Sequence, residues 1–502
     1  MQKSPLFDAF AELDDIHKDF NSITSAFHNA CAKVGQLVVA GGNGDTDHEL
    51  LERRSKDIME ALKSLELTTE IIGKSKAFLR RAINSSKSLV PISILPADMM
   101  TRIFELAIVP SPGTIRNTRK LLSYPASMIS SVCALWRYLA INDPWLWVDI
   151  DLVEGGSTRI SKLLMARALL WSVRARNIPT CVNFHSDSRC KGEDLRRQIG
   201  SLITHARSFN FLPTSSDAYV LSIFRSYNLS GRSDCLEKVS IDGPLTNTSQ
   251  IPTRFNWLDC LPPTLTTLNL AYLSDVLTPS LHELTTLLST CPRLQTLVLS
   301  VLTIPPGTNN NHPKIDLPCL QNLEIWLDSE SILERILSLV NPGTRDLDLS
   351  FRLPEPDNEY CHRAAQLFCG RSRVTRLILG DVKSGSDRRF AKLLDKLPEL
   401  QSLSLIFFYN ATCDALDALL LPVGEEHWPR CPRLQTLKIF QANIGPRAQQ
   451  QLKRITRTYK LANLTIRGWF PDGEGGQRNG DMSAWLKTQV KSLDYDYETD
   501  TK

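Results

Sequence analysis

The residues that could carry out catalysis are few in this sequence, and their spacing matches no common catalytic motif. G-x-S-x-G, H-E-x-x-H and G-x-x-x-x-G-K-[ST] are absent, and no G-x-G-x-x-G follows an expected strand. The nine histidines are dispersed, and His185, on an expected strand, is the one that could act as a base. Because no nucleophile or carboxylate stands at a fixed spacing from His185, we expect no enzyme, no catalytic residue and no cofactor.

Metal ligation and disulfide formation are not indicated by the twelve cysteines, which contain no C-x-x-C pair. Several adjoin leucines of the expected core or precede Pro-Arg-Leu, namely Cys235, Cys319, Cys291 and Cys431. We interpret them as small buried hydrophobic residues in a reducing compartment, which predicts a cytoplasmic or nuclear protein and no metal site.

The bulk composition excludes two classes of partner. A net charge of +4 on 502 residues is too small to indicate nucleic-acid binding, and basic residues occur singly. The longest apolar stretches, such as Leu403 to Tyr409, are too short to span a bilayer, and no apolar signal core follows the first residues. We therefore expect neither a nucleic-acid partner nor a membrane.

Residues 1–88 have the spacing of two long helices. Each carries one apolar seam, and Gly41 to Asp45 separates them. Segment 1–49 has eight acidic and three basic residues, whereas segment 53–87 has nine basic and four acidic residues. These opposite charges favour an antiparallel helical hairpin within one chain, and the alternative is a coiled coil between two chains. The first seam comprises Ala9, Leu13, Ile16, Phe20, Ile23, Phe27, Ala30, Val34 and Leu37, and the second comprises Leu51, Ile58, Leu62, Leu65, Ile72, Leu79 and Ile83.

Residues 89–146 differ in character from both of their neighbours. Leu95-Pro96-Ala97-Asp98 precedes apolar residues at helical spacing, and proline is well accommodated in a first helical turn. A Pro/Gly/Ser-bearing insert near residues 110–125 separates this helix from Val132-Cys133-Ala134-Leu135-Trp136-Arg137. The segment is predicted to be a small all-α module.

Residues 147–470 are periodic in units of L-x-x-L-x-L. Their average spacing of about 28.5 residues falls at the long end of the roughly 20–29 residues of leucine-rich repeats. Alternate side chains of a strand point to one face, so the second and third leucines would line a shared core. The predicted fold is an α/β solenoid, a leucine-rich-repeat horseshoe, followed by a partly flexible tail at 471–502. The units begin at Trp147, Pro179, Ala206, Leu236, Leu265, Leu294, Leu320, Thr344, Val374, Leu400, Leu434 and Leu461.

The residues between the paired leucines are expected on the open, concave side, and most are small or polar. A central and C-terminal group is larger or charged, as at interaction hot spots. We predict that this group binds a protein substrate, with Trp326 as its centre. The alternative is that Trp326 folds over a neighbouring strand and fills a gap. The group comprises Glu324, Trp326, Asp346, Asp348, Arg376, Ile378, Lys438 and Phe440.

The segment from Leu95 to Trp147 resembles the F-box motif, with Asp98 in place of the usual Glu, Ala134 in place of a basic residue and a longer stretch between its helices. With the repeats, the chain is similar to F-box proteins with leucine-rich repeats of the fungal type. The matching positions are Leu95, Pro96, Asp98, Met99, Ile103, Phe104, Val132, Cys133, Trp136, Arg137, Leu146 and Trp147.

This resemblance implies a substrate-recognition subunit of an SCF-type cullin-RING ubiquitin ligase. The F-box would bind a Skp-type adaptor, and through it a cullin, while the repeats would hold an unidentified protein substrate. One copy is expected in the complex, and the alternative function is a leucine-rich-repeat scaffold outside any ligase. The residues implied to contact the adaptor are Leu95, Pro96, Met99, Ile103, Phe104, Val132, Cys133 and Trp136.

Overall fold

The computed structural model divides the chain into two compact units, Met1–Leu95 and Pro96–Lys502. The turn expected at residues 41–45 and nearly all of the insert expected near 110–125 lie outside the described residues. The structure describes residues 5–40, 48–85, 91–108, 125–154, 158–186, 193–213, 223–224, 227, 235–242, 256–275, 277–305, 314–353, 358–381, 387–407, 414–420, 429–469 and 475–497.

The first unit contains the two long helices that the seams predict, α1 (Pro5–Ala40) and α2 (His48–Ser85), followed by a short 3₁₀ helix, η1 (Pro91–Ile94). The described seam residues of both helices, such as Phe20 and Leu62, remain exposed. The two helices are therefore confirmed, whereas the packing of one seam against the other in a hairpin stays a prediction.

The second unit begins with a helical module made of α3 (Ala97–Ile108), α5 (Pro125–Val132), α6 (Ala134–Asn142) and the 3₁₀ helix η2 (Pro144–Trp147). Local capping sets these boundaries. The Cys133 sulfur accepts a hydrogen bond from the Trp136 N–H at 3.4 Å, and the Asp143 carboxylate accepts one from the Trp145 N–H at 3.1 Å. The described residues of this segment are helical, as predicted.

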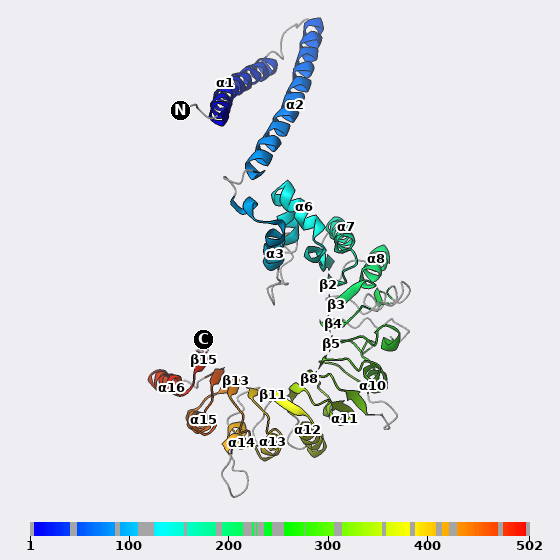
Figure 1. Ribbon diagram of the computed structural model, residues 1–502, viewed down its shortest axis with the longest axis vertical. Helices are drawn as coiled ribbons and strands as arrows, with labels where there is room; N and C mark the ends of the chain where they lie inside the picture. The colour runs from blue at the N-terminus through cyan, green and yellow to red at the C-terminus, as the bar shows by residue number, and fades with distance from the viewer. Residues whose placement is uncertain are drawn as a thin grey trace. The chain divides into compact units, whose positions relative to one another are not determined.

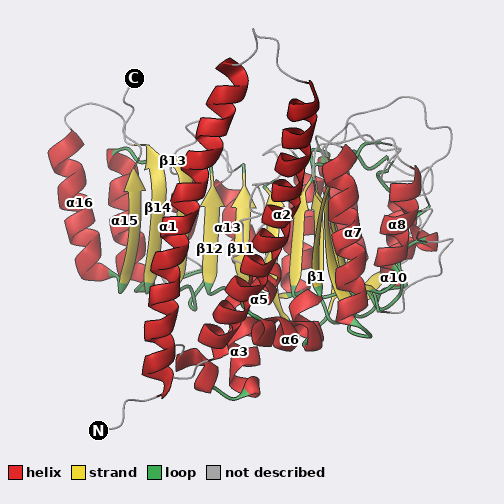
Figure 2. Cartoon of the chain, turned by 90° about the horizontal axis from the view of Figure 1, so that it is seen from above, coloured by secondary structure: helices red, strands yellow, loops and turns green. Residues whose placement is uncertain are grey.

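A parallel sheet of thirteen strands forms the rest of the second unit, and Figure 2 shows strands running in one direction. Figure 1 shows its strands on the inner side of an arc and the helices on the outer side. The strands, in their order across the sheet, are β1 (Asp149–Glu154), β2 (Thr180–Ser186), β3 (Ala206–Pro213), β4 (Lys238–Asp242), β5 (Thr267–Ala271), β6 (Thr296–Ser300), β8 (Asn322–Trp326), β10 (Asp346–Arg352), β11 (Arg373–Gly380), β12 (Ser402–Ile406), β13 (Thr436–Asn443), β14 (Asn463–Trp469) and β15 (Ser492–Tyr497).

The helices on the outer side cover the apolar face of the sheet. Two short strands, β7 (Ile315–Leu317) and β9 (Val340–Pro342), pair with each other apart from the main sheet. The helices are α7 (Thr158–Ala175), α8 (Glu193–Ile203), η3 (Trp257–Asp259), α10 (Leu281–Ser289), α11 (Glu330–Leu339), α12 (Glu359–Arg371), α13 (Asp387–Leu394), α14 (Asp414–Leu420), α15 (Pro446–Tyr459) and α16 (Gly475–Gln489).

Alternation along the strands places the core as predicted. In β8, Leu323 and Ile325 are buried between sheet and helices, whereas Glu324 and Trp326 face the inner side and are half-buried. Every one of the twelve predicted repeat starts lies within two residues of the first residue of an observed strand. Cys291 and Cys431 are buried as predicted, but Cys235 is exposed, because it stands before the strand rather than in it.

The segment 471–502, predicted to be a partly flexible tail, contributes structure of its own. Gly475 begins α16 rather than belonging to a loop, and β15 pairs with β14 along its whole length. The sheet therefore continues by one strand beyond residue 470.

The helical module and the sheet share a buried core. Trp147 is fully buried, and its indole N–H donates to the Ala140 carbonyl oxygen of α6 at 2.7 Å. Its ring lies 5.9 Å from that of Trp171 in α7, and the Arg174 guanidinium stacks over it. The module is thereby fixed to the first strand of the sheet.

Candidate binding surfaces

The helical module has an apolar interior and a largely apolar exterior. Met100, Phe104, Ala126, Ile129 and Leu146 fill its core. Many apolar side chains nevertheless remain exposed on its helices. They are Met99, Ile103, Leu106, Met128, Val132, Leu135, Tyr138, Ile141 and Trp145.

Such a concentration is unusual for a surface that faces only water, because exposed apolar patches commonly mark interaction sites. Met99, Ile103 and Leu106 recur at helical spacing on one face of α3, where they are 55%, 38% and 60% exposed. Val132, at the end of α5, is 53% exposed. The module can therefore offer a partner an apolar face without giving up its own core.

The residues expected to contact an adaptor differ in their exposure, and only Phe104 is buried. Leu95, Pro96, Met99, Ile103 and Val132 are exposed. Half-buried Cys133 and Trp136 lie partly within the module.

Phe104 is a correction to the expected contact set. It is only 1% exposed, and its ring centroid lies 5.0 Å from that of Trp136. A side chain so buried cannot touch a partner, so Phe104 holds the module together and positions Ile103 beside it. Phe104 and Ile103 lie on different faces of α3, and both faces are apolar. Helical spacing alone could not show which of the two faces forms the core.

The expected substrate-binding residues share the inner face of the sheet. Glu324 of β8 is in register with Ser350 of β10, which is in register with Ile378 of β11. The same row continues through Ser404 of β12 to Lys438 of β13. Phe440 lies two residues further along β13, half-buried. Strands far apart in sequence thus bring most of the predicted group together.

Trp326 lies differently from the hot spot that was predicted. Its indole N–H donates to the Glu324 carboxylate at 2.7 Å. A Cβ atom at Gly380, two strands away, would lie 2.2 Å from Cζ3 of this indole. The ring therefore crosses β10 and packs on the Gly380 backbone, which is the gap-filling alternative. Trp326 is half-buried, so only part of the ring can meet a partner.

Three charged members of the predicted group, Asp346, Asp348 and Arg376, form ion pairs between neighbouring strands. Asp348 accepts from Arg376 at 2.9 Å, and Asp346 pairs with Arg373 at 2.9 Å. These pairs are largely solvent-exposed, so each contributes little to stability and can exchange partners. The central inner face therefore presents paired charges of both signs beside Ile378.

Sequence reasoning missed a polar ladder at the start of the sheet. The Asn210 amide donates to the Asn183 oxygen at 2.7 Å, and the Asn183 amide donates to Asp151 at 2.8 Å. These residues occupy the alternate positions of β1, β2 and β3, so the period of two could have revealed them. The leucine pattern of these three repeats is weak, so the sequence did not indicate these positions clearly.

Burial shifts the pKa values of two titratable groups beside this ladder. Burial, with Asp149 nearby, raises the pKa of the Cys181 thiol to about 11, so the thiolate is scarce near neutral pH. Burial lowers the pKa of His185, against the opposing effect of Asp151. The shift of His185 favours its neutral imidazole, and Cys181 on the same strand is favoured as the protonated thiol.

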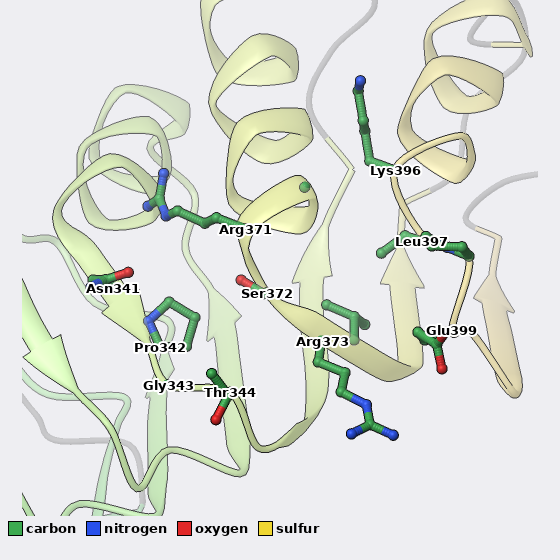
Figure 3. A pocket seen from close by; sticks show the side chains of 13 residues that line it. Asn341, Pro342, Gly343, Thr344, Arg371, Ser372, Arg373, Lys396, Leu397 and Glu399 are labelled. Atoms are coloured by element: carbon green, nitrogen blue, oxygen red, sulfur yellow. The ribbon is translucent and has the colours of Figure 1, made fainter.

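A pocket of about 760 Å³ lies at the edge of the sheet where strands begin and helices end. Figure 3 shows that its cationic side chains diverge, with Arg373 and Lys396 pointing to opposite sides. Arg371 donates to the Val340 carbonyl oxygen at 2.8 Å, and Arg373 is paired with Asp346. The charges of this pocket are therefore largely satisfied within the protein.

Comparisons with known proteins do not identify a family for this chain. No protein-family model matches the sequence, and the comparison with curated proteins gave no significant match. Within the described ranges, no helix has the length and apolarity needed to cross a membrane. The same part of the chain contains no group of three or more His, Cys, Asp or Glu side chains placed to hold a metal ion.

Proposed function

We propose that this chain is the substrate-recognition subunit of an SCF-type cullin-RING ubiquitin ligase. In this proposal, the helical module is an F-box that binds a Skp-type adaptor and through it a cullin. The sheet and its helices form a leucine-rich-repeat horseshoe that holds a protein substrate. The chain itself carries no catalytic residue, because the ubiquitin transfer occurs on a partnered conjugating enzyme.

The observation that carries the proposal is the exposure of Met99, Ile103 and Val132 at motif positions of a module whose core is already complete. Apolar side chains that serve no internal packing are what an obligate protein interface requires. Support for the repeat assignment comes from strand units about 28.5 residues apart, within the roughly 20–29 residues of such repeats at their long end.

Support for a substrate-holding role comes from the inner face of the sheet. Its central strands present Ile378, Lys438 and ion pairs that lie near the surface. A concave array of parallel strands can contact a partner through many side chains at once. We propose one copy of the chain in each complex, in the cytoplasm or nucleus, without nucleic acid or membrane.

The test is co-purification of the full chain with a Skp-type adaptor. Ile103→Asp with Val132→Asp should abolish co-purification, because charged groups would be buried in an apolar interface. The matched control is Tyr360→Asp with Leu367→Asp, which alters two exposed apolar residues of α12. Retained co-purification by a folded Ile103/Val132 variant would contradict the contact assigned to these two side chains. Failure of the folded parent chain to co-purify would leave the chain as a scaffold outside the ligase.

A further inference from the structure

A second pocket, of about 530 Å³, lies between the ends of α15 and α16 and the starts of the last strands. We call it the basic pocket, and its cationic members are Arg457, Lys460 and Lys491. Gln435 and Gln489 add amide groups to its wall. Arg457 comes from the last turn of α15, Lys460 follows that helix, and Lys491 directly precedes β15. Figure 1 places α15 and α16 at the C-terminal end of the arc.

Two arginines elsewhere along the same edge of the sheet have carboxylate partners. Arg207 pairs with Glu237 at 2.8 Å, and Arg433 pairs with Glu399. In contrast, none of the described carboxylates forms an ion pair with Arg457, Lys460 or Lys491. The basic pocket therefore gathers three cations that the described carboxylates do not pair.

The partial negative charges at the C-terminal ends of the two helices are too small to neutralise three cations. Each helix C-terminus carries a partial charge of roughly −0.5, so the ends of α15 and α16 together supply about one negative charge. Three full positive charges remain about two charges in excess. The pocket is thus an electropositive hollow within the protein, suited to an anionic group that accepts hydrogen bonds from several donors at once.

The aromatic residue beside the pocket argues against a nucleic-acid ligand. Trp485 of α16 is half-buried. The Lys453 ammonium lies 5.6 Å from its ring and the Arg457 guanidinium 5.2 Å. A ring already engaged by two cations is a poor platform for stacking bases, on which sequence-tolerant binding of single strands depends.

We propose that the basic pocket binds an acidic segment of a protein partner, through carboxylate or phosphate groups. The inference that acidic segments are the substrate class rests on the proposed receptor function. The inference that the basic pocket binds an acidic segment does not. Arg457 is held in place by Trp485, so little side-chain freedom is lost when it meets an anion. Lys460 directly follows α15 and Lys491 directly precedes β15, and both supply further hydrogen-bond donors to the pocket.

The experiment measures binding of fluorescent twelve-residue peptides to the full chain in complex with its adaptor. One peptide is rich in Glu and Asp, one carries phosphoserines, and one has Gln in their place. We expect both acidic peptides to bind, the Gln peptide to bind at least about tenfold more weakly, and added salt to weaken binding. A stronger phosphoserine peptide would identify phosphate as the preferred group.

Two double variants locate the site. Lys460→Glu with Lys491→Glu should weaken acidic-peptide binding by about tenfold or more. Lys238→Glu with Arg345→Glu makes the same change in net charge at exposed positions elsewhere and should leave binding unchanged. Equal losses in both variants, or equal binding of the Gln peptide, would overturn the proposal, as would a single-stranded oligonucleotide that outcompetes both acidic peptides.

A third variant separates this proposal from the proposed function. Ile103→Asp with Val132→Asp, tested without adaptor, should keep acidic-peptide binding even though adaptor binding is lost. If peptide binding fails in the parent chain while the adaptor still binds, the basic-pocket proposal fails alone. If the adaptor fails to bind while the peptide binds, only the ligase assignment fails.

Discussion

The indole ring of Trp326 lies against Gly380, although the two residues stand on strands separated by β10. In Gly380→Ala, the new Cβ would approach Cζ3 of the indole to 2.2 Å and force the ring away from the sheet. Overpacking of this kind costs about 1–3 kcal/mol in the free energy of unfolding. Thermal and denaturant unfolding measure it. Gly370→Ala is the matched control, because the new Cβ would meet a Lys396 side-chain carbon at an ordinary 3.8 Å. Equal unfolding free energies for both variants would contradict the Trp326–Gly380 contact.

Phe104 and Ile103 should differ in what they disturb. Phe104→Ala opens a cavity in the core of the helical module and is expected to cost about 3–5 kcal/mol in stability. Ile103→Ala removes a side chain that is 38% exposed, so it should alter stability less than Phe104→Ala while weakening adaptor binding. Chemical denaturation and adaptor pull-down, run on both variants, check this division. The prediction fails if Phe104→Ala is as stable as the parent chain.

Arg376 tests the inner face of the sheet as a substrate-binding surface. Its ion pair with Asp348 is exposed, so Arg376→Glu should cost less than about 1 kcal/mol in stability. We expect the variant to lose proteins captured by the parent chain in affinity-capture mass spectrometry with a proteasome inhibitor. Adding Asp348→Arg restores an ion pair of reversed direction but should not restore capture. An unchanged set of captured proteins in both variants would count against this surface.

Asp149 should make stability depend on pH at the start of the sheet. Burial, reinforced by Asp151, raises the pKa of the Asp149 carboxyl, so the folded chain holds this proton more tightly than the unfolded chain. Its contribution to stability is therefore greatest below the unfolded value near 3.8 and is lost as pH rises through the raised folded-state pKa. Asp149→Asn removes this loss, so its melting temperature should exceed that of the parent at pH 7, with the gain shrinking towards pH 3. Asp346→Asn, at an exposed carboxylate, is the control, and a constant difference across this pH range would contradict the assignment.

If the apolar seams of α1 and α2 pack on each other within one chain, we expect the protein to be a monomer. Light scattering of the chain with its adaptor should then give the mass of one copy of each. The described seam residues are exposed, so the alternative is that they pack between two chains and give a dimer. A dimer that becomes a monomer on deletion of residues 1–88 would overturn the intramolecular hairpin.

The sequence by itself determined the strand positions and the buried face of the sheet. Alternation of leucines within five or six residues is a local property, and backbone geometry converts it directly into two faces. The last strand was missed because Ser492-Leu493-Asp494-Tyr495 lacks the repeated leucines, although pairing with β14 suffices to form it.

Only the tertiary structure decided which side chains meet. Trp326 and Gly380, or Arg457 and Lys491, are tens of residues apart in sequence, and their proximity depends on strand register and helix packing. The same holds for Phe104, because helical spacing marks an apolar residue but not which of two apolar faces becomes the core. Burial and charge pairing arise from neighbours across the fold, so the candidate sites emerge only once those neighbours are in place.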